Sequence, residues 1–256
     1  MPLSQPYRRV SRQLLDGSYA HSGNGQYVGH PAYATKPEHY VRAFLLLQED
    51  LKTLFEYVEP ADENLACYSY RIHELLMRAC IEVEANCKAI LLANEYAFGG
   101  NPSMLDYQKI EKSHRLASYQ VRVPTWDGVE RVRRPFERWA RGESLPWYKA
   151  YNESKHDRHA NFKRATFESA LDAIGGCAVI LAAQFQESNF TSLSSFIACE
   201  SGSDGWEDGI GGYFQLKYPD DWPMAERYDF NWQELKGRAD PFVNFPYPPA
   251  APRRCP

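Results

Sequence analysis

The chain has 256 residues, of which 44% are hydrophobic and 24% charged, and its formal net charge is −4. These values predict an ordinary folded core and exclude a protein coated with basic residues to hold nucleic acid. The N-terminus lacks an apolar signal segment, and the longest apolar run, residues 173–183, is too short to cross a bilayer. We therefore expect a cytoplasmic protein with no membrane partner.

The six cysteines stand at positions 67, 80, 87, 177, 199 and 255. They form no Cys-x-x-Cys pair and no Cys/His spacing typical of a metal site. This pattern favours buried free thiols in a reducing compartment, and it predicts no metal and no cofactor.

Residues 1–36 are polar, show no period and predict a flexible N-terminal arm. Apolar residues then recur at spacings near 3.6 and predict a helix over 37–59 and a longer helix over 63–98. On the second helix, Glu74 and Arg78 belong to a run of i,i+4 charged pairs. They either form a stabilising ladder along the helix or face a polar cluster on a neighbouring helix.

Residues 103–118 predict a shorter helix, whereas 121–126 are too few and too irregular to predict a strand. Aromatic residues stand among arginines over 131–141, where they could stack on bases but are more typical of a loop anchored to a core. A further helix begins near Pro146, after Ser144 at the expected cap, and continues with a kink into the apolar segment 162–186. The pair Gly175-Gly176 in that segment permits close packing, within the domain or across a dimer.

The composition changes after Asn189. The glycine-rich stretch 201–212 is acidic and makes a poor phosphate-binding loop, and 213–218 could form one strand. The rest, through residue 256, predicts an aromatic, proline-rich arm packed on the helices. The expected fold is therefore all-α: an antiparallel bundle of four to five helices over 37–189, with irregular arms at 1–36 and 190–256.

The most informative stretch runs from Asn152 to His159 and combines an amide, an ammonium, two imidazoles, a carboxylate and a guanidinium. In a helix, Asn152 and His156 share one face at i,i+4. Lys155 and His159 then form a second such pair beside them. The stretch lies in a basic block, 131–164, which holds ten Lys or Arg against four Asp or Glu and suits a polyanionic partner.

Several kinds of chemistry fit this stretch poorly. The histidines lack clear further metal ligands, and the chain has no Gly-x-Ser-x-Gly, P-loop or dinucleotide-binding signature. Metal-free RNA cleavage fits better, because it needs a group that transfers protons near neutral pH and cations that stabilise the charged transition state. His156, Lys155 and Arg158 are of these types.

The Tyr-Asn-x-x-Lys-His-Asp-Arg form, on a late helix that follows a long charged helix, resembles the HEPN superfamily over about residues 37–188. That family carries Arg, often followed by a polar residue, and then His on one helix; here Asn152 and His156 match and Tyr151 stands in place of the arginine. The resemblance implies a metal-independent endoribonuclease of toxin–antitoxin or antiphage systems, with an antitoxin or other protein partner, built at a homodimer interface.

We accordingly assign catalytic roles to His156, Asn152, Lys155 and Tyr151. The candidate substrate-binding residues are Arg158, His159, Arg78 and Glu74. Because a phenol is not a cation at neutral pH, two alternatives stay open: a catalytically inactive helical interaction module, and an RNA- or nucleotide-binding module without chemistry.

Overall fold

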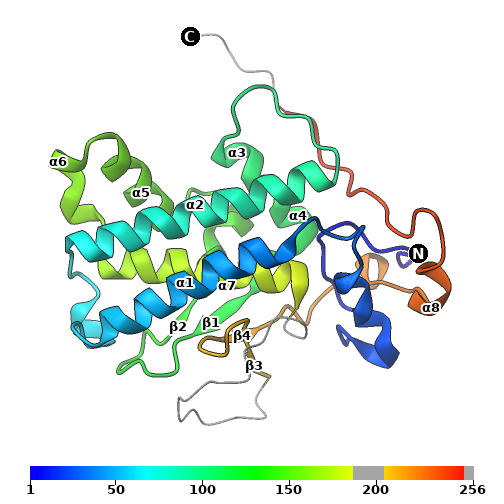
Figure 1. The fold of residues 1–256 in the computed structure, drawn as a ribbon, viewed down its shortest axis with the longest axis horizontal. Helices are drawn as coiled ribbons and strands as arrows, with labels where there is room; N and C mark the ends of the chain where they lie inside the picture. Colours follow the sequence, from blue (N-terminus) through cyan, green and yellow to red (C-terminus); the bar gives the residue numbers. More distant parts are fainter. Residues whose placement is uncertain (187–204, 251–256) are drawn as a thin grey trace.

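The computed structural model describes residues 1–186 and 205–250. Its centre is a group of three long helices that pack side by side, α1 (Pro37–Phe55), α2 (Tyr70–Ala93) and α7 (Phe167–Phe185) (Figure 1). A fourth helix, α5 (Pro146–His156), packs on α2 and α7 and leads into α6 (Arg158–Asn161). The remaining helices are short: α3 (Met104–Tyr107), α4 (Glu111–His114) and α8 (Trp232–Leu235).

The predicted all-α fold is wrong, because the described residues also contain a four-stranded antiparallel sheet in the order β2-β1-β4-β3. Its strands are β1 (Gln120–Arg122), β2 (Val132–Arg133), β3 (Glu207–Asp208) and β4 (Gln215–Lys217). Val121 lies opposite Arg133 on one side and Leu216 on the other. Strands of two or three residues are too short to show alternation, and β1 pairs with a strand about 95 residues later along the chain. Local pattern therefore could not reveal this pairing.

The helix boundaries follow from local capping. α2 begins at Tyr70 and not near Glu63, because the Oγ of Ser69 accepts a hydrogen bond from the backbone N–H of Ile72 at 3.2 Å. α7 begins after Thr166, whose Oγ1 likewise accepts from the backbone N–H of Ser169 at 3.2 Å. α2 and α7 therefore start where a hydroxyl satisfies an N–H group that has no partner within the helix, whereas α1 starts with Pro37 and has no side-chain cap.

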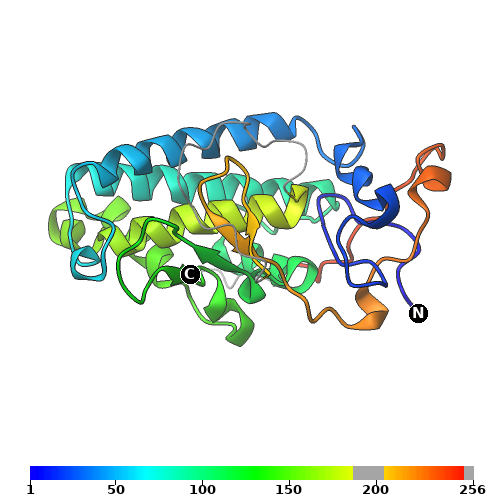
Figure 2. The same ribbon diagram turned by 90° about the horizontal axis from the view of Figure 1, so that it is seen from below.

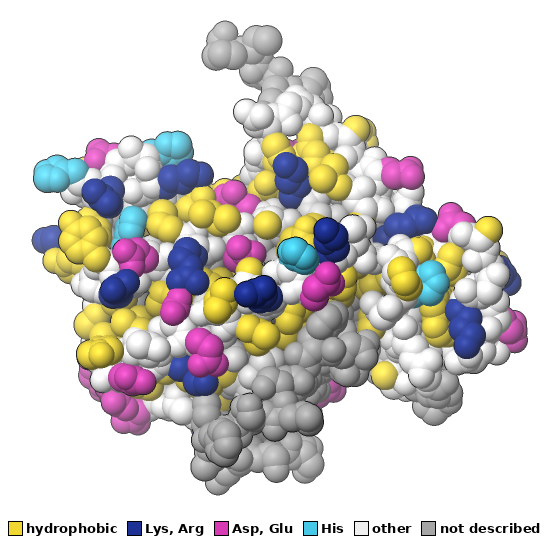
Figure 3. Space-filling model, in the orientation of Figure 1, with side chains coloured by type: hydrophobic (Ala, Val, Ile, Leu, Met, Phe, Trp, Pro, Cys, Tyr) yellow, Lys and Arg dark blue, Asp and Glu magenta, His cyan; other side chains and the backbone are white. Residues whose placement is uncertain are grey.

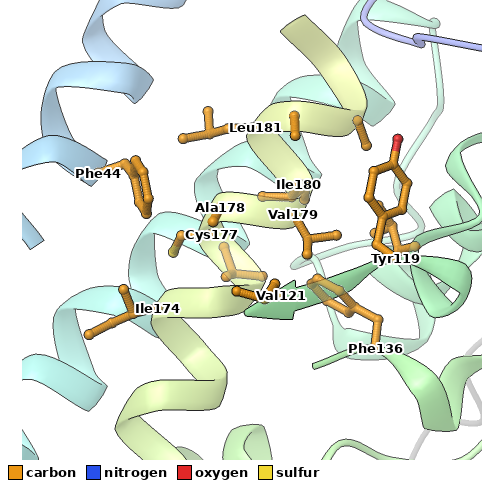
Figure 4. Packing of buried hydrophobic residues seen from close by; sticks show 14 of the residues in the cluster. Phe44, Tyr119, Val121, Phe136, Ile174, Cys177, Ala178, Val179, Ile180 and Leu181 are labelled. Atoms are coloured by element: carbon orange, nitrogen blue, oxygen red, sulfur yellow. The ribbon is translucent and has the colours of Figure 1, made fainter. Parts of the chain in front are cut away.

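α7 is the core of the molecule, since nearly every side chain along it is buried. Figure 4 shows it between the α1 and α2 helices on one side and Val121, Tyr119 and Phe136 on the other. Figure 2 shows the sheet on the side of α7 away from α1. By length and composition α7 could cross a membrane, but 83% of its apolar window is buried within the fold.

The four cysteines among the described residues are free, and Cys80, Cys87 and Cys177 are fully buried, as the sequence predicts. Burial raises the pKa of all three thiols well above the usual value. Cys199 and Cys255 lie outside the described residues.

The two glycines of α7 allow close packing within the domain. An added Cβ at Gly176 would lie 3.4 Å from the Phe136 ring and 3.6 Å from Trp147. At Gly175 the nearest atom would be Pro135 Cγ, also at 3.4 Å. One methyl group fits at these distances, and a larger side chain does not.

We therefore expect opposite effects from two substitutions at Gly176. Gly176→Ala should stabilise the protein by up to about 1 kcal/mol, because alanine favours the helix and its methyl group only reaches van der Waals contact. Gly176→Leu should destabilise it by about 1–3 kcal/mol through overpacking. Urea unfolding followed by circular dichroism measures both, and a Leu variant as stable as wild type would contradict the packing described here.

The N-terminal segment differs from the expected flexible arm, because residues 9–14 are buried in the core. The Arg9 guanidinium donates to Gln184 Oε1 at 2.7 Å, and the Ser11 backbone N–H donates to the Ala183 carbonyl at 2.9 Å. The segment runs beside the C-terminal segment: the Tyr228 hydroxyl accepts from the Tyr7 backbone N–H at 3.0 Å and donates to the Val10 carbonyl at 2.9 Å. The expected boundary between residues 189 and 190, and residues 201–204 of the predicted loop, lie outside the described residues.

Arg12 joins these segments to the helices. Its guanidinium is 2% exposed and donates twice to the Ser113 carbonyl, at 3.2 and 3.0 Å. It also lies over the Trp222 ring at 4.6 Å and the Phe245 ring at 5.5 Å. Carbonyls and ring faces from distant parts of the chain thus compensate the cost of burying this charge, which no local sequence pattern could indicate.

Two titratable groups on α4 have opposite effects on how the stability of the protein depends on pH. His114 is fully buried between Ser113 Oγ at 2.7 Å and the Arg9 carbonyl at 2.8 Å, and burial lowers its pKa to about 4. Burial raises the pKa of Glu111 to about 7, although its Oε2 accepts from the Ala117 backbone N–H at 3.0 Å. As the pH falls from about 6.5 to about 4, the unfolded chain gains a proton at His114 that the folded protein resists, and stability falls. As the pH falls from about 7 to 4.5, the folded protein gains a proton at Glu111 before the unfolded chain does, and stability rises.

Glu111→Gln should therefore make folding more sensitive to acid. The variant should be more stable than wild type at pH 8, where the buried carboxylate is ionised, and should lose stability more steeply between pH 6.5 and 4.5. One pKa unit corresponds to about 1.4 kcal/mol. Urea midpoints at pH 8, 6.5 and 5 test this, and parallel curves for the two proteins would contradict it.

Candidate functional site

α5 presents one buried and one open face. Its buried residues are Trp147, Ala150, Tyr151 and Ser154. Its first residue is Pro146, and the cap is Leu145 without a side-chain hydrogen bond, so Ser144 is not the cap that the sequence predicts. The Trp147 indole donates to the Pro135 carbonyl at 2.8 Å, which ties the start of α5 to the segment before it.

α5 ends at His156 because Asp157 leaves the helical conformation, with φ −141° and ψ 80°. The Asp157 carboxylate then accepts from the Ala160 backbone N–H at 3.1 Å and starts α6. Asn152 and His156 therefore share a helix face as predicted, but Lys155 and His159 do not form an i,i+4 pair in one continuous helix. The chain turns between them.

His156 is exposed at the end of α5 and Asn152 is half-buried one turn before it. Neither side chain has a hydrogen-bond or ion-pair partner among residues 1–186 and 205–250. Both are therefore available to an incoming molecule, and the imidazole stands in water and not in the core.

Tyr151, the residue before Asn152, is 1% exposed. Its hydroxyl accepts a hydrogen bond from Lys155 Nζ at 3.0 Å, and the ammonium lies 5.0 Å from the centre of its ring. This hydrogen bond raises the pKa of Lys155, while burial raises the pKa of Tyr151. At neutral pH the pair is thus an ammonium held by a neutral phenol. The buried tyrosine supplies no charge itself but holds the Lys155 ammonium through this hydrogen bond.

A second hydrogen bond fixes α5 to α2. The Tyr148 hydroxyl donates to Glu84 Oε1 at 2.7 Å, and its ring lies 5.3 Å from that of Tyr151. Burial raises the pKa of Tyr148, so the phenol keeps its proton. This contact was not predicted from the sequence. Its only signal there was a tyrosine and a glutamate on the facing sides of two amphipathic helices.

α6 carries two further residues of the motif. Arg158 and His159 are exposed, and the Arg158 guanidinium lies 6.0 Å from the centre of the Tyr70 ring at the start of α2. Tyr70 in turn contacts Phe162, with ring centroids 4.7 Å apart. Sequence reasoning also missed these two aromatic residues; the signal was a tyrosine outside the apolar stripe of α2.

The positive charge of the block 131–164 is unevenly compensated. Five of its arginines form ion pairs with nearby carboxylates: Arg164, and Arg133, Arg134, Arg138 and Arg141. Phe136 and Trp139 between them are buried, so these aromatics anchor the segment and do not offer ring faces to a ligand. Within the described residues, Arg131, Lys155, Arg158 and Lys163 have no carboxylate at ion-pair distance. Three of these four cations lie on α5, on α6 and in the 3-10 turn Phe162–Arg164 that follows.

We call the half-buried Asn152 and the exposed Lys155, His156, Arg158 and His159 the α5–α6 corner. Figure 3 shows histidine, lysine and arginine side chains gathered over these helices, at the upper left. The corner lies at the end of the molecule opposite the N-terminal segment and α8 (Figure 1).

Glu74 and Arg78 do not join this corner. They line a hollow of about 540 Å³ with Asp50, Thr53 and Tyr57 on the α1 side of α2. Arg78 pairs with Asp50 of α1, and Glu74 pairs with Arg71 at 3.1 Å. The two residues thus connect the first two long helices and lie away from the groups on α5.

The residues described contain no group of three or more His, Cys, Asp or Glu side chains that could hold a metal ion. The chain matches no protein-family model, no curated protein and no solved structure. The function of the α5–α6 corner must therefore be inferred from its side chains: an exposed imidazole, a half-buried amide, and cations without carboxylate partners among the described residues.

The Lys155–Tyr151 contact should be measurable in a double-mutant cycle. Tyr151→Phe and Lys155→Met should couple by about 0.5–1.5 kcal/mol, because either change alone removes the same hydrogen bond. Urea unfolding of the four proteins gives the coupling. Lys149→Met is the matched control, since Lys149 lies 3.9 Å from Glu153 and should not couple to Tyr151. Additive effects for Tyr151 and Lys155 would contradict the contact.

Proposed function

We propose that this protein is a metal-independent endoribonuclease that cleaves RNA at the α5–α6 corner. One observation carries the proposal: His156 is exposed and unpartnered beside cations that lack carboxylate partners among the described residues, whereas the arginines of 133–141 are paired. An exposed basic surface that includes a histidine fits a phosphodiester better than it fits a neutral or cationic ligand.

The chemistry follows from the groups present. A neutral imidazole takes the proton of a ribose 2′-hydroxyl, and the 2′-oxygen forms a bond to phosphorus. The bond from phosphorus to the 5′-oxygen breaks, and that oxygen receives a proton from an imidazolium. The products are a 2′,3′-cyclic phosphate and a 5′-hydroxyl. Lys155 and Arg158 stabilise the negative charge on the reacting phosphate, and Asn152 orients the phosphate or His156.

The resemblance to the HEPN superfamily supports a homodimer as the active form. In one copy, His156 projects from a helix end into solvent. A second copy facing the first across α5 supplies both the wall that excludes water and a second His156, so that one imidazole serves as base and the other as acid. The same resemblance supports a role in stress or phage-defence systems of the cytoplasm, with a protein antitoxin as a further partner.

His156→Ala should abolish cleavage and leave the fold intact. A substitution of an exposed side chain without partners changes stability by less than about 0.5 kcal/mol, whereas loss of a general acid–base group slows a reaction about 10²–10⁴-fold. A fluorescent single-stranded RNA, incubated with EDTA-treated protein, measures cleavage, and thermal unfolding measures stability.

Two controls make this experiment specific. His39→Ala removes another exposed histidine, 70% exposed at the start of α1, and should cleave like wild type. A substrate with a single 2′-deoxyribose should resist cleavage at that position, and the specific activity should fall on dilution as the dimer dissociates. Equal cleavage by His156→Ala would overturn the proposal. A marked loss of melting temperature in that variant would instead favour a structural role and the inactive interaction module.

A further inference from the structure

Three aromatic side chains lie beside the α5–α6 corner: Tyr68, Tyr70 and Phe162, which we call the aromatic shelf. Phe162 is at its centre, with the Tyr70 ring centroid at 4.7 Å and the Tyr68 ring centroid at 5.8 Å. Tyr70 is 64% exposed and Tyr68 43% exposed. Large parts of two rings therefore face solvent at one place.

The backbone holds the shelf rigid. Tyr68 pairs with Thr166 in an antiparallel bridge just before α7. Tyr70 is the first residue of α2, directly after the Ser69 cap. His73 completes the packing from below, with its ring 5.7 Å from Phe162 and only 9% exposed. A ligand that stacks on the shelf would not need to order these rings first, which favours binding.

Charge links the shelf to the corner. Arg158 of the corner lies over the Tyr70 ring at 6.0 Å. Lys163, which directly follows Phe162, is exposed and has no carboxylate partner in the described part of the chain. The one acidic side chain of this stretch of α2, Glu74, is already paired with Arg71. Flat apolar surface thus stands directly next to uncompensated positive charge.

We propose that the aromatic shelf is a nucleobase subsite, which stacks an unpaired base of the RNA whose phosphates lie at the α5–α6 corner. A nucleotide joins a flat π-surface to a phosphate, and this combination matches exposed rings beside Arg158 and Lys163. A neutral sugar, or a peptide without acidic side chains, offers no such anion. The inference rests on the proposed function for the placement of the phosphates, and it adds a preference for unpaired bases, since a paired base cannot reach a ring face.

Binding can be measured apart from cleavage. The probe is a fluorescein-labelled oligoadenylate of roughly ten nucleotides, and fluorescence anisotropy is recorded with protein that carries His156→Ala, so that the probe stays intact. In this background, Tyr70→Ala should weaken binding about fivefold to a hundredfold, because one base loses its stacking partner. Tyr70→Phe keeps the ring and should bind like its parent.

The matched control is Tyr57→Ala. Tyr57 is 81% exposed after the end of α1 and contacts no other ring among the described residues, so its removal should leave binding unchanged. An oligonucleotide of the same length without bases should bind the parent and the Tyr70→Ala variant equally weakly. Circular dichroism and melting of each variant show that a loss of binding is not a loss of fold.

The outcomes separate the shelf from the catalytic proposal. Equal binding by Tyr70→Ala and its parent, or no binding of the probe by the parent, overturns the subsite even if wild type cleaves RNA. Tyr70-dependent binding by a protein that never cleaves supports the subsite and discards the endoribonuclease. Competition by free AMP as strong as that by the oligonucleotide assigns the shelf to mononucleotides and overturns its role in RNA binding.

Discussion

The burial of α7 on all sides is the constraint on which the rest of the structure depends. A helix with almost no polar face must be covered all round, and here α1, α2 and α5 cover one part and β1 with the segment around Phe136 covers the other. The sheet, whose Val121 and Leu216 are fully buried, exists largely to close this second side. Because α5 is one of the covering helices, its buried face is fixed by Trp147 and Tyr151, and the opposite face must look outward.

This constraint explains why some residues of the motif are buried and others are exposed. Tyr151 and Ser154 are buried against the core, whereas Lys155 and His156 lie at the open end of the same helix. The phenol accepts a hydrogen bond from the Lys155 ammonium, so a buried residue of α5 holds an exposed one.

Prediction from sequence succeeded where the physics is local. The periodicity of α1, α2 and α7 was visible because each buries a stripe or a whole surface, and the shared face of Asn152 and His156 follows from helix geometry alone. The turn at Asp157 had a local signal too, since aspartate favours helix caps. The charged residues on both sides of Asp157, however, are equally compatible with one continuous helix. The sheet and the burial of Arg12 depend on partners about 95 and 100 residues away, as the β1–β4 register and the Ser113 carbonyl show. No window along the chain contains both halves of such a contact.

The pairing of the two terminal segments has a consequence for how the chain acquires its shape during translation. The backbone carbonyl of Val10 can accept its hydrogen bond only after Tyr228, 218 residues further along the chain, has been synthesised. Until the C-terminal segment is made, Arg12 lacks Trp222 and Phe245, whose rings face its guanidinium in the finished molecule. The central helices can assemble early, whereas this end can close only after the C-terminal segment has been translated. A chaperone that shields the nascent N-terminal segment would therefore protect it until these partners exist.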